Sequence, residues 1–178
     1  DDGDMVALTT SQVVALSGAQ VASLTEDQLD GLTSVQLRAI EVADIGSLTT
    51  DQVVTLDSAQ LSYLTTSQVA GMNSDQLSAI DAGEIVGLTA AAIEALSGAQ
   101  LGSLTTEQVA GLTTAQLRAI ETRDIASLTT DQLTSIDDGD MVALTTSQVV
   151  ALSGAQVASL TEDQLDGLTS VQLRAIEV

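Results

Sequence analysis

Several residue types are missing from this sequence, and their absence limits what the protein can do. Its 178 residues include no cysteine, histidine, lysine, proline, tryptophan or phenylalanine, and the only aromatic residue is Tyr63. Histidine, cysteine and lysine supply most of the general bases and nucleophiles that act near neutral pH. We therefore predict that the chain is not an enzyme. Any core must be built from leucine, valine, isoleucine, methionine and alanine.

Positive charge is also scarce. Four arginines (Arg38, Arg118, Arg123 and Arg174) face 25 acidic residues, which gives a net charge of −21. Phosphate backbones and anionic membrane surfaces attract lysine and arginine clusters, so neither nucleic acid nor an anionic membrane is an expected partner. No apolar run approaches the roughly 18 residues that a membrane-spanning helix needs. Divalent cations or basic proteins are the partners that the charge favours.

The chain consists of an eight-residue repeat, here called an octad. Twenty-two octads fill residues 1–176 without an insertion or deletion, and the whole of 1–178 reads as one repeat array. The fifth position is always valine, leucine, isoleucine or methionine, and the eighth is always leucine, isoleucine or methionine. With 44% hydrophobic residues, the composition is not that of a disordered chain. Repetition of this kind predicts a solenoid.

Two longer periods are superimposed on the octad. Residues 137–178 are identical to residues 1–42, so residues 1–136 form one long repeat of 17 octads and 137–178 begin the next copy. Octads with an acid at the fourth position start at residues 1, 41, 81, 121 and 137. The long repeat is therefore three groups of five octads followed by two. We expect one turn of the solenoid to relate to the 40-residue group, which would align the acidic octads in a stripe.

Each octad carries a helix-start signal. Its first residue is serine, threonine, aspartate or asparagine in 20 of 22 octads, and its fourth is glutamine in 16. In such a capping box the first side chain accepts from the backbone N–H three residues later, and the glutamine reaches back. The apolar eighth residue and the apolar fifth residue of the next octad stand where a hydrophobic staple has its pair, as in Leu8 and Val13.

The spacing predicts an all-α superhelical solenoid of short capped helices, one per octad. In one continuous helix, eight residues at about 100° each would carry the apolar stripe about 80° past two full turns, so the stripe would spiral around the rod. In a strand, positions five and eight would face opposite sides. Helices this short are unstable alone and must stack. A β-solenoid remains the alternative, because threonine and valine would tolerate it.

The seventh position is almost always alanine, serine or glycine, with Thr55 and Tyr63 as departures. A small residue near a helix C-terminus permits close stacking, and a glycine there also permits a left-handed cap. Because Tyr63 stands where a small residue is usual, we expect it to be exposed and to mark a contact point.

The acidic octads are the candidate binding sites. Their carboxylates stand three residues apart, and hard cations such as Ca²⁺ bind clustered carboxylate and carbonyl oxygens. Two interpretations stay open: a weak multivalent calcium site, or acids that replace threonine and glutamine in the same capping roles. The candidate calcium ligands are Asp1, Asp2, Asp4, Glu41, Asp44, Asp81, Glu84, Glu121, Asp124, Asp137, Asp138 and Asp140.

Three arginines recur at one place in the pattern. Arg38, Arg118 and Arg174 each precede a glutamate by three residues. This spacing predicts either a surface ion pair, which contributes less than about 1 kcal/mol, or a contact between neighbouring turns or molecules.

The segment LTTSQVVAL (8–16 and 144–152) is similar to the first helix of the DNA-reading repeats of TAL effectors, but their second helix, base-reading residues and 34-residue period are absent. The units LTTDQVVTL (48–56) and LTTEQVAGL (104–112) resemble the reiterated L-T-x-x-Q-[VL]-x-x-L tracts of very large bacterial surface proteins and exoproteins, and this pattern covers the whole chain. That resemblance implies a secreted, rod-like spacer or adhesive region.

These observations lead to one expected function and two alternatives. We expect an extracellular or cell-surface structural protein of a bacterium that forms a stalk, filament or sheath by stacking and self-association. The first alternative is a calcium-responsive adhesive module. The second is an intracellular scaffold that presents a concave groove to peptides.

Overall fold

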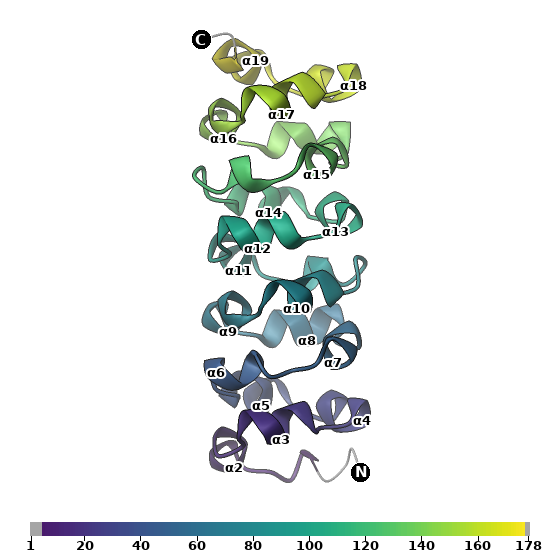
Figure 1. Cartoon of the computed structure of the whole chain (residues 1–178), viewed down its shortest axis with the longest axis vertical. Helices are drawn as coiled ribbons and strands as arrows, with labels where there is room; N and C mark the ends of the chain where they lie inside the picture. Colours follow the sequence, from purple (N-terminus) through teal and green to yellow (C-terminus); the bar gives the residue numbers. More distant parts are fainter. Residues whose placement is uncertain (1–4, 177–178) are drawn as a thin grey trace.

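Each octad begins a new short helix, and the helices wind into a straight rod. The computed structural model describes residues 5–176, and α2 and α19 lie at opposite ends of the rod (Figure 1). The α-helices are α2 (Thr10–Val14), α3 (Gly18–Ala22), α4 (Glu26–Asp30), α5 (Ser34–Ala39), α6 (Val42–Ile45), α7 (Thr50–Val54), α8 (Ser58–Tyr63), α9 (Thr66–Gly71), α10 (Ser74–Ala79), α11 (Ala90–Glu94), α12 (Gly98–Ser103), α13 (Thr106–Ala110), α14 (Thr114–Ala119), α15 (Thr130–Thr134), α16 (Thr146–Ala151), α17 (Gly154–Ser159), α18 (Glu162–Asp166) and α19 (Ser170–Ile176). Three octads form 3₁₀ segments instead, η1 (Ile85–Gly87), η2 (Ile125–Ser127) and η3 (Asp138–Ala143).

The predicted capping box starts the helices. In α14 the backbone N–H of Gln116 donates to Thr113 Oγ1 at 3.3 Å, and the Thr113 N–H donates to Gln116 Oε1 at 2.8 Å. The same reciprocal pair recurs in nearly all of the glutamine octads. The helix ends where the eighth residue takes an extended conformation, as at Ile120 with φ −56° and ψ 125°. This extended residue turns the chain toward the next cap, so no helix in residues 5–176 is longer than seven residues.

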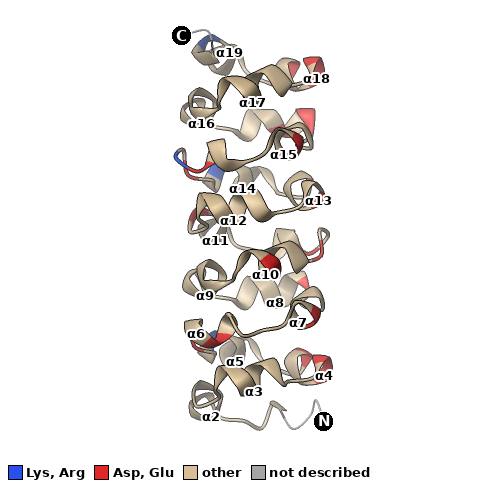
Figure 2. Cartoon of the chain, viewed as in Figure 1, with Lys and Arg blue, Asp and Glu red and all other residues tan. Residues whose placement is uncertain are grey.

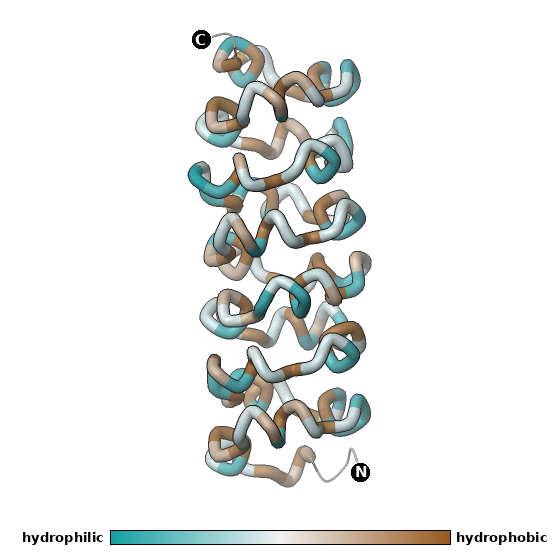
Figure 3. Tube along the Cα trace, viewed as in Figure 1, coloured by the Kyte–Doolittle hydropathy of each residue, from teal (hydrophilic) through white to brown (hydrophobic). Residues whose placement is uncertain are grey.

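The core runs along the axis of the rod. The fifth residue of each inner octad is almost completely buried, and the eighth residue is nearly as buried, as Leu117 (1% exposed) and Ile120 (2% exposed) show. Hydrophobic and hydrophilic segments accordingly alternate along every turn (Figure 3). The core is aliphatic throughout, as the composition required. The all-α solenoid is confirmed, and the described residues contain no strand of the alternative β-solenoid.

One superhelical turn takes between three and four octads. Each helix packs on the helix three octads away, as α2 does on α5 and α11 on α14. Side chains at the fourth position bond to the backbone 28 and 31 residues earlier. The expectation that 40 residues make one turn is therefore wrong. Five octads run well past a full turn, so successive acidic octads lie on different sides of the rod and form no single stripe (Figure 2).

The left-handed cap that a seventh-position glycine permits is not used in the described residues. Gly31, Gly111 and Gly167 cap helices in the right-handed region, and no residue in the described part of the chain has a positive φ. Because the eighth residue turns the chain from an ordinary extended conformation, a left-handed residue is not needed. Within residues 5–176, no helix has both the length and the apolar character needed to cross a membrane.

Candidate functional site

The most regular polar feature of the molecule is a ladder of glutamine side chains between neighbouring turns. In α14, Gln116 Nε2 donates to the carbonyl oxygen of Ile85 at 2.9 Å and to that of Leu88 at 2.8 Å. Eleven glutamines bond in this way to the fifth and eighth residues of the octad four earlier: Gln36, Gln52, Gln68, Gln76, Gln108, Gln116, Gln132, Gln148, Gln156, Gln164 and Gln172. We call this set the glutamine ladder.

Each ladder glutamine fulfils two roles with one amide group. Its Oε1 accepts from the cap residue of its own octad, and its Nε2 supplies both of its N–H groups to the turn below. The ladder side chains are between 1% and 4% exposed. A buried amide is stable only when its hydrogen bonds are made, and no buried side-chain nitrogen or oxygen in the described residues lacks a partner. The sequence predicted the first role but not the second.

The acidic octads depart from the ladder and from the capping box. Three of the four that the structure describes are the 3₁₀ segments η1, η2 and η3, and the fourth contains α6, the shortest α-helix. Asp81 and Asp137 each accept from the N–H two residues later, at 2.8 and 2.9 Å, and Glu41, the N-cap residue of α6, makes no side-chain cap. The interpretation that these acids keep the capping roles of threonine and glutamine is therefore wrong for the capping box.

The acid at the fourth position points instead to the helix three octads earlier. Glu84 Oε2 accepts from the backbone N–H of Ser58, the first residue of α8, at 2.5 Å. Asp44 and Asp124 lie close to Gly18 and Gly98, the first residues of α3 and α12, since a Cβ built on each glycine would be 3.1 and 3.2 Å from the carboxylate Oδ1. A carboxylate is favoured at a helix N-terminus, where backbone N–H groups have no partner in the helix. These acids thus help to join neighbouring turns.

Small residues make room for this contact. A Cβ on Gly18 or Gly98 would collide with the hydroxyl of Ser47 or Ser127, the seventh residue of the acidic octad above. At η1 the sizes are reversed, because a Cβ on Gly87 would collide with the carbonyl of Ser58. The second residue of one octad and the seventh residue of the octad three later are thus complementary in size: a glycine at one position accommodates a serine at the other. The close stacking predicted from the small seventh position is confirmed.

This packing explains a further pattern in the sequence. Five octads combine alanine at the third position with glutamine at the fourth, and they start at residues 17, 57, 97, 113 and 153. The first four start 24 residues before an acidic octad. The fifth starts 24 residues before Glu177, which begins the last partial octad. Elsewhere the third position is often aspartate or glutamate, which would repel the acid above it. The spacing of 24 residues was visible in the sequence as the signal of a contact three octads apart.

The candidate calcium ligands are spread over the rod rather than gathered. Asp1, Asp2 and Asp4 lie outside the described residues. Arg123, on the surface, pairs with Glu121 at 2.8 Å and with Asp124 at 3.2 Å. The hydrogen bond that Arg123 donates to Asp124 and the charge of Glu121 raise the pKa of the guanidinium. No three carboxylates between residues 5 and 176 come together as a metal site would require. Calcium binding stays a prediction.

Two arginines connect neighbouring turns through neutral partners. Arg38 Nε donates to the carbonyl of Tyr63 at 3.0 Å, and Arg118 Nε donates to that of Ala143 at 3.4 Å, each 25 residues later. The prediction of a contact between neighbouring turns is confirmed for these two. The expectation that Tyr63 is exposed is wrong, because it is half-buried and packs against the core.

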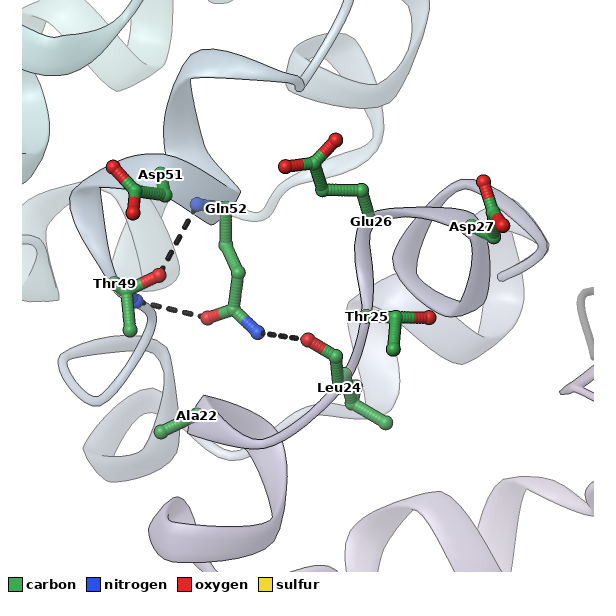
Figure 4. A pocket seen from close by; sticks show the side chains of 8 residues that line it. All are labelled: Ala22, Leu24, Thr25, Glu26, Asp27, Thr49, Asp51 and Gln52. Atoms are coloured by element: carbon green, nitrogen blue, oxygen red, sulfur yellow. Dashed lines mark hydrogen bonds between the residues drawn. The ribbon is translucent and has the colours of Figure 1, made fainter.

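The hollows on the surface are shallow gaps between successive turns. The one in Figure 4 is lined by Ala22, Leu24, Thr25, Glu26, Asp27, Thr49, Asp51 and Gln52. Its floor is a rung of the ladder, since Gln52 Nε2 donates to the carbonyl of Leu24 at 2.7 Å. The amide of Gln52 therefore already joins two turns at this hollow, and the carboxylates of Glu26, Asp27 and Asp51 stand around it.

The sequence matches the model of the ALTTAQ repeat over residues 1–34, 37–74, 77–114 and 133–170. The chain belongs to the ALTTAQ repeat family. The matches at 37 and 77 begin 40 residues apart, which is the group of five octads. No curated protein matches the chain significantly. The family confirms a tandem repeat tract, and the architecture is that of a structural repeat protein.

Proposed function

We propose that this chain is a rod-forming spacer on the outside of a bacterial cell, the body of a stalk or filament, and that it has no catalytic role. The observation that carries the proposal is the glutamine ladder, which makes the same pair of bonds at eleven octads between Gln36 and Gln172. In a solenoid, stability is the sum of such contacts between neighbours, and length is set by the number of repeats. Mechanical span is the property that this design provides.

Two further features support an extracellular rod. The surface is acidic and rich in threonine, and a net charge of −21 keeps parallel rods apart and soluble. The chain has no cysteine, so its stability depends on hydrogen bonds and aliphatic packing and on no redox condition. The resemblance of its units to the tracts of large bacterial exoproteins points to the same location.

The experiment that tests the rod is small-angle X-ray scattering of the purified chain and of a chain extended by one more 136-residue repeat. A rod predicts an unchanged cross-sectional radius and a maximum dimension that grows in proportion to the added octads. A cross-section that thickens with added sequence, or the scattering of a random coil, would overturn the proposal. Labelling of intact producing cells with an antibody to the repeat tests the location, and a signal only after lysis would contradict it.

A further inference from the structure

The glutamine ladder is interrupted over three successive octads near the middle of the rod, between α10 and α13 (Figure 1). The octads that begin at residues 81, 89 and 97 have as their fourth residues Glu84, Ala92 and Gln100. The carboxylate of Glu84 accepts from Ser58 and can donate nothing to the earlier turn, and Ala92 has no polar side chain. Gln100 keeps the bond to the carbonyl of Met72 at 2.8 Å, but its second bond goes to Ala70, one residue past the usual fifth position.

Elsewhere the gaps in the ladder are single. The octads that begin at 41, 57, 121 and 137 also lack the usual pair of bonds, but each lies between two octads that have it. Because each rung joins octads four apart, the rungs of four successive octads cross any boundary along the rod. The four octads after Met72 keep only the rung of Gln76, and the four after Ile80 keep only that of Gln108. Every other set of four successive octads within residues 33–176 keeps at least two complete rungs.

The interruption leaves carbonyl groups without partners on the turn formed by residues 49–72. In a complete rung the carbonyl of the eighth residue accepts from a glutamine, as that of Leu88 does from Gln116. The carbonyls of Leu56 and Leu64 accept no hydrogen bond from the residues that the structure describes, although these residues are only 2% and 5% exposed. A buried carbonyl without a partner lowers the stability of the contact in which it lies.

Aliphatic packing continues across the interruption. Ile85, Ile93 and Leu101 are completely buried, and a Cβ on Gly87 would collide with the carbonyl of Ser58. Hydrophobic contact has no preferred direction, whereas a hydrogen bond is strong only near one geometry. The two turns therefore stay in contact here, but they are held less firmly against tilting and separation than the laddered turns are.

We propose that the turns formed by residues 49–72 and 81–104 meet at a compliant joint, where the rod bends and where it opens first under tension. In a solenoid each unit contacts only its neighbours, so the array divides at its weakest interface while the segments on either side stay folded. The inference rests on the proposed rod. It gives that rod one place at which it extends and closes again before the laddered segments unfold.

Hydrogen exchange of the intact chain, followed by mass spectrometry, measures the joint because amides exchange when the segment that contains them opens. Residues 53–64 and 85–96 should exchange at least about tenfold faster than residues 117–136, whose carbonyls receive the rungs of Gln148, Gln156 and Gln164. Uniform protection over residues 53–136 would overturn the joint and leave the rod intact. Absence of protection along the whole chain would refute the rod itself.

A repaired variant and a matched control show whether the missing rungs are the cause. Glu84→Gln with Ala92→Gln supplies both missing amides, and the octad at 57 shows that aspartate and glutamine complete a capping box. The control Ala91→Gln with Glu94→Gln makes the same change of charge and composition at exposed positions. The repaired variant should slow exchange in residues 53–64 at least about tenfold, and the control should leave it unchanged. Equal rates in the two variants would contradict the proposal.

A converse variant tests the same cause without adding side chains to the joint. Gln148→Glu with Gln156→Ala copies the glutamate and the alanine of the joint into the two octads that follow the acidic octad at 137. Residues 137–160 then lack three successive rungs. Exchange in residues 117–128 should become at least about tenfold faster than in the wild-type chain. Unchanged exchange there would show that the ladder does not decide where the rod opens.

Pulling with optical tweezers tests the response to tension. The chain has no cysteine, so Ser11→Cys and Ser170→Cys, at exposed positions, supply the two attachment points. The wild-type chain and the control should show a first, reversible extension at a force below that of the remaining unfolding. In the repaired variant the rate of this opening at the same force should fall at least about tenfold. A single unfolding event at the same force in all three chains would contradict a joint that opens first.

Discussion

The side-chain amide of Gln116 binds the carbonyl of Leu88, 28 residues earlier, at 2.8 Å, while the same side chain accepts from the N–H of Thr113. One residue thus starts a helix and joins that helix to the turn below. Because this relationship repeats along the rod, the octad is a unit of both local and tertiary structure. Substitutions of the ladder glutamines will therefore affect both the helix start and the contact between turns.

Replacing a ladder glutamine by methionine will destabilise the chain. Gln116→Met keeps the volume but removes the acceptor of the cap and leaves the carbonyls of Ile85 and Leu88 without that partner, which we expect to cost about 2–4 kcal/mol. Gln12→Met removes only the cap contribution, worth about 1 kcal/mol or less. Urea unfolding followed by circular dichroism measures both. Equal losses would show that the bonds between turns contribute nothing.

Replacing the same residue by glutamate will make stability depend on pH. In Gln116→Glu the cap is retained, but burial and the two facing carbonyls will raise the pKa of the new carboxyl in the folded state. The folded state then holds the proton more tightly than the unfolded state, so the variant is closest to wild type at low pH and loses stability as pH rises through the folded pKa. The difference in unfolding free energy from wild type should grow from about pH 4.5 to about pH 7.5. Gln12→Glu, which is exposed, serves as the control and should show little change.

Two octads that both begin Ser-Gly-Ala-Gln provide a matched test of the packing between turns. Gly98→Ala places a methyl group against the Ser127 side chain and should destabilise the chain by about 1–3 kcal/mol. Gly154→Ala, in the same Ser-Gly-Ala-Gln sequence, meets open space and should stabilise its helix by about 0.5–1 kcal/mol. Adding Ser127→Gly to Gly98→Ala should restore most of the loss. Thermal unfolding of the four chains would show this, and a loss of the same size at both glycines would contradict it.

Thermal unfolding can distinguish the effect of charge screening by salt from an effect of calcium binding. Because the net charge is −21, screening should raise the melting temperature as NaCl is added. If the carboxylates act only in capping and in contacts between turns, CaCl₂ at the same ionic strength should give a closely similar shift, and calorimetry should register no saturable heat. A larger, saturable effect of calcium that is lost in Asp81→Asn with Glu84→Gln would instead establish the calcium-responsive alternative.

The local structure could be read from the sequence because its causes lie within eight residues. The threonine or serine cap and the glutamine three residues later, as in Thr113 and Gln116, specify where each helix starts, and the alternation of positions five and eight specifies which side is buried. The number of octads per turn could not be read in this way. It depends on how far the extended eighth residue turns the chain, and the 40-residue group suggested a value that the structure contradicts.

The sequence by itself determined that this protein is an uninterrupted array of capped, aliphatic helical units. Only the tertiary structure decided which octads meet. Contacts between Gln116 and Leu88, Glu84 and Ser58, or Gly98 and Ser127 arise when the chain returns after three to four octads. That return is a property of the whole superhelix, because small rotations add up from one unit to the next, and no single octad contains it.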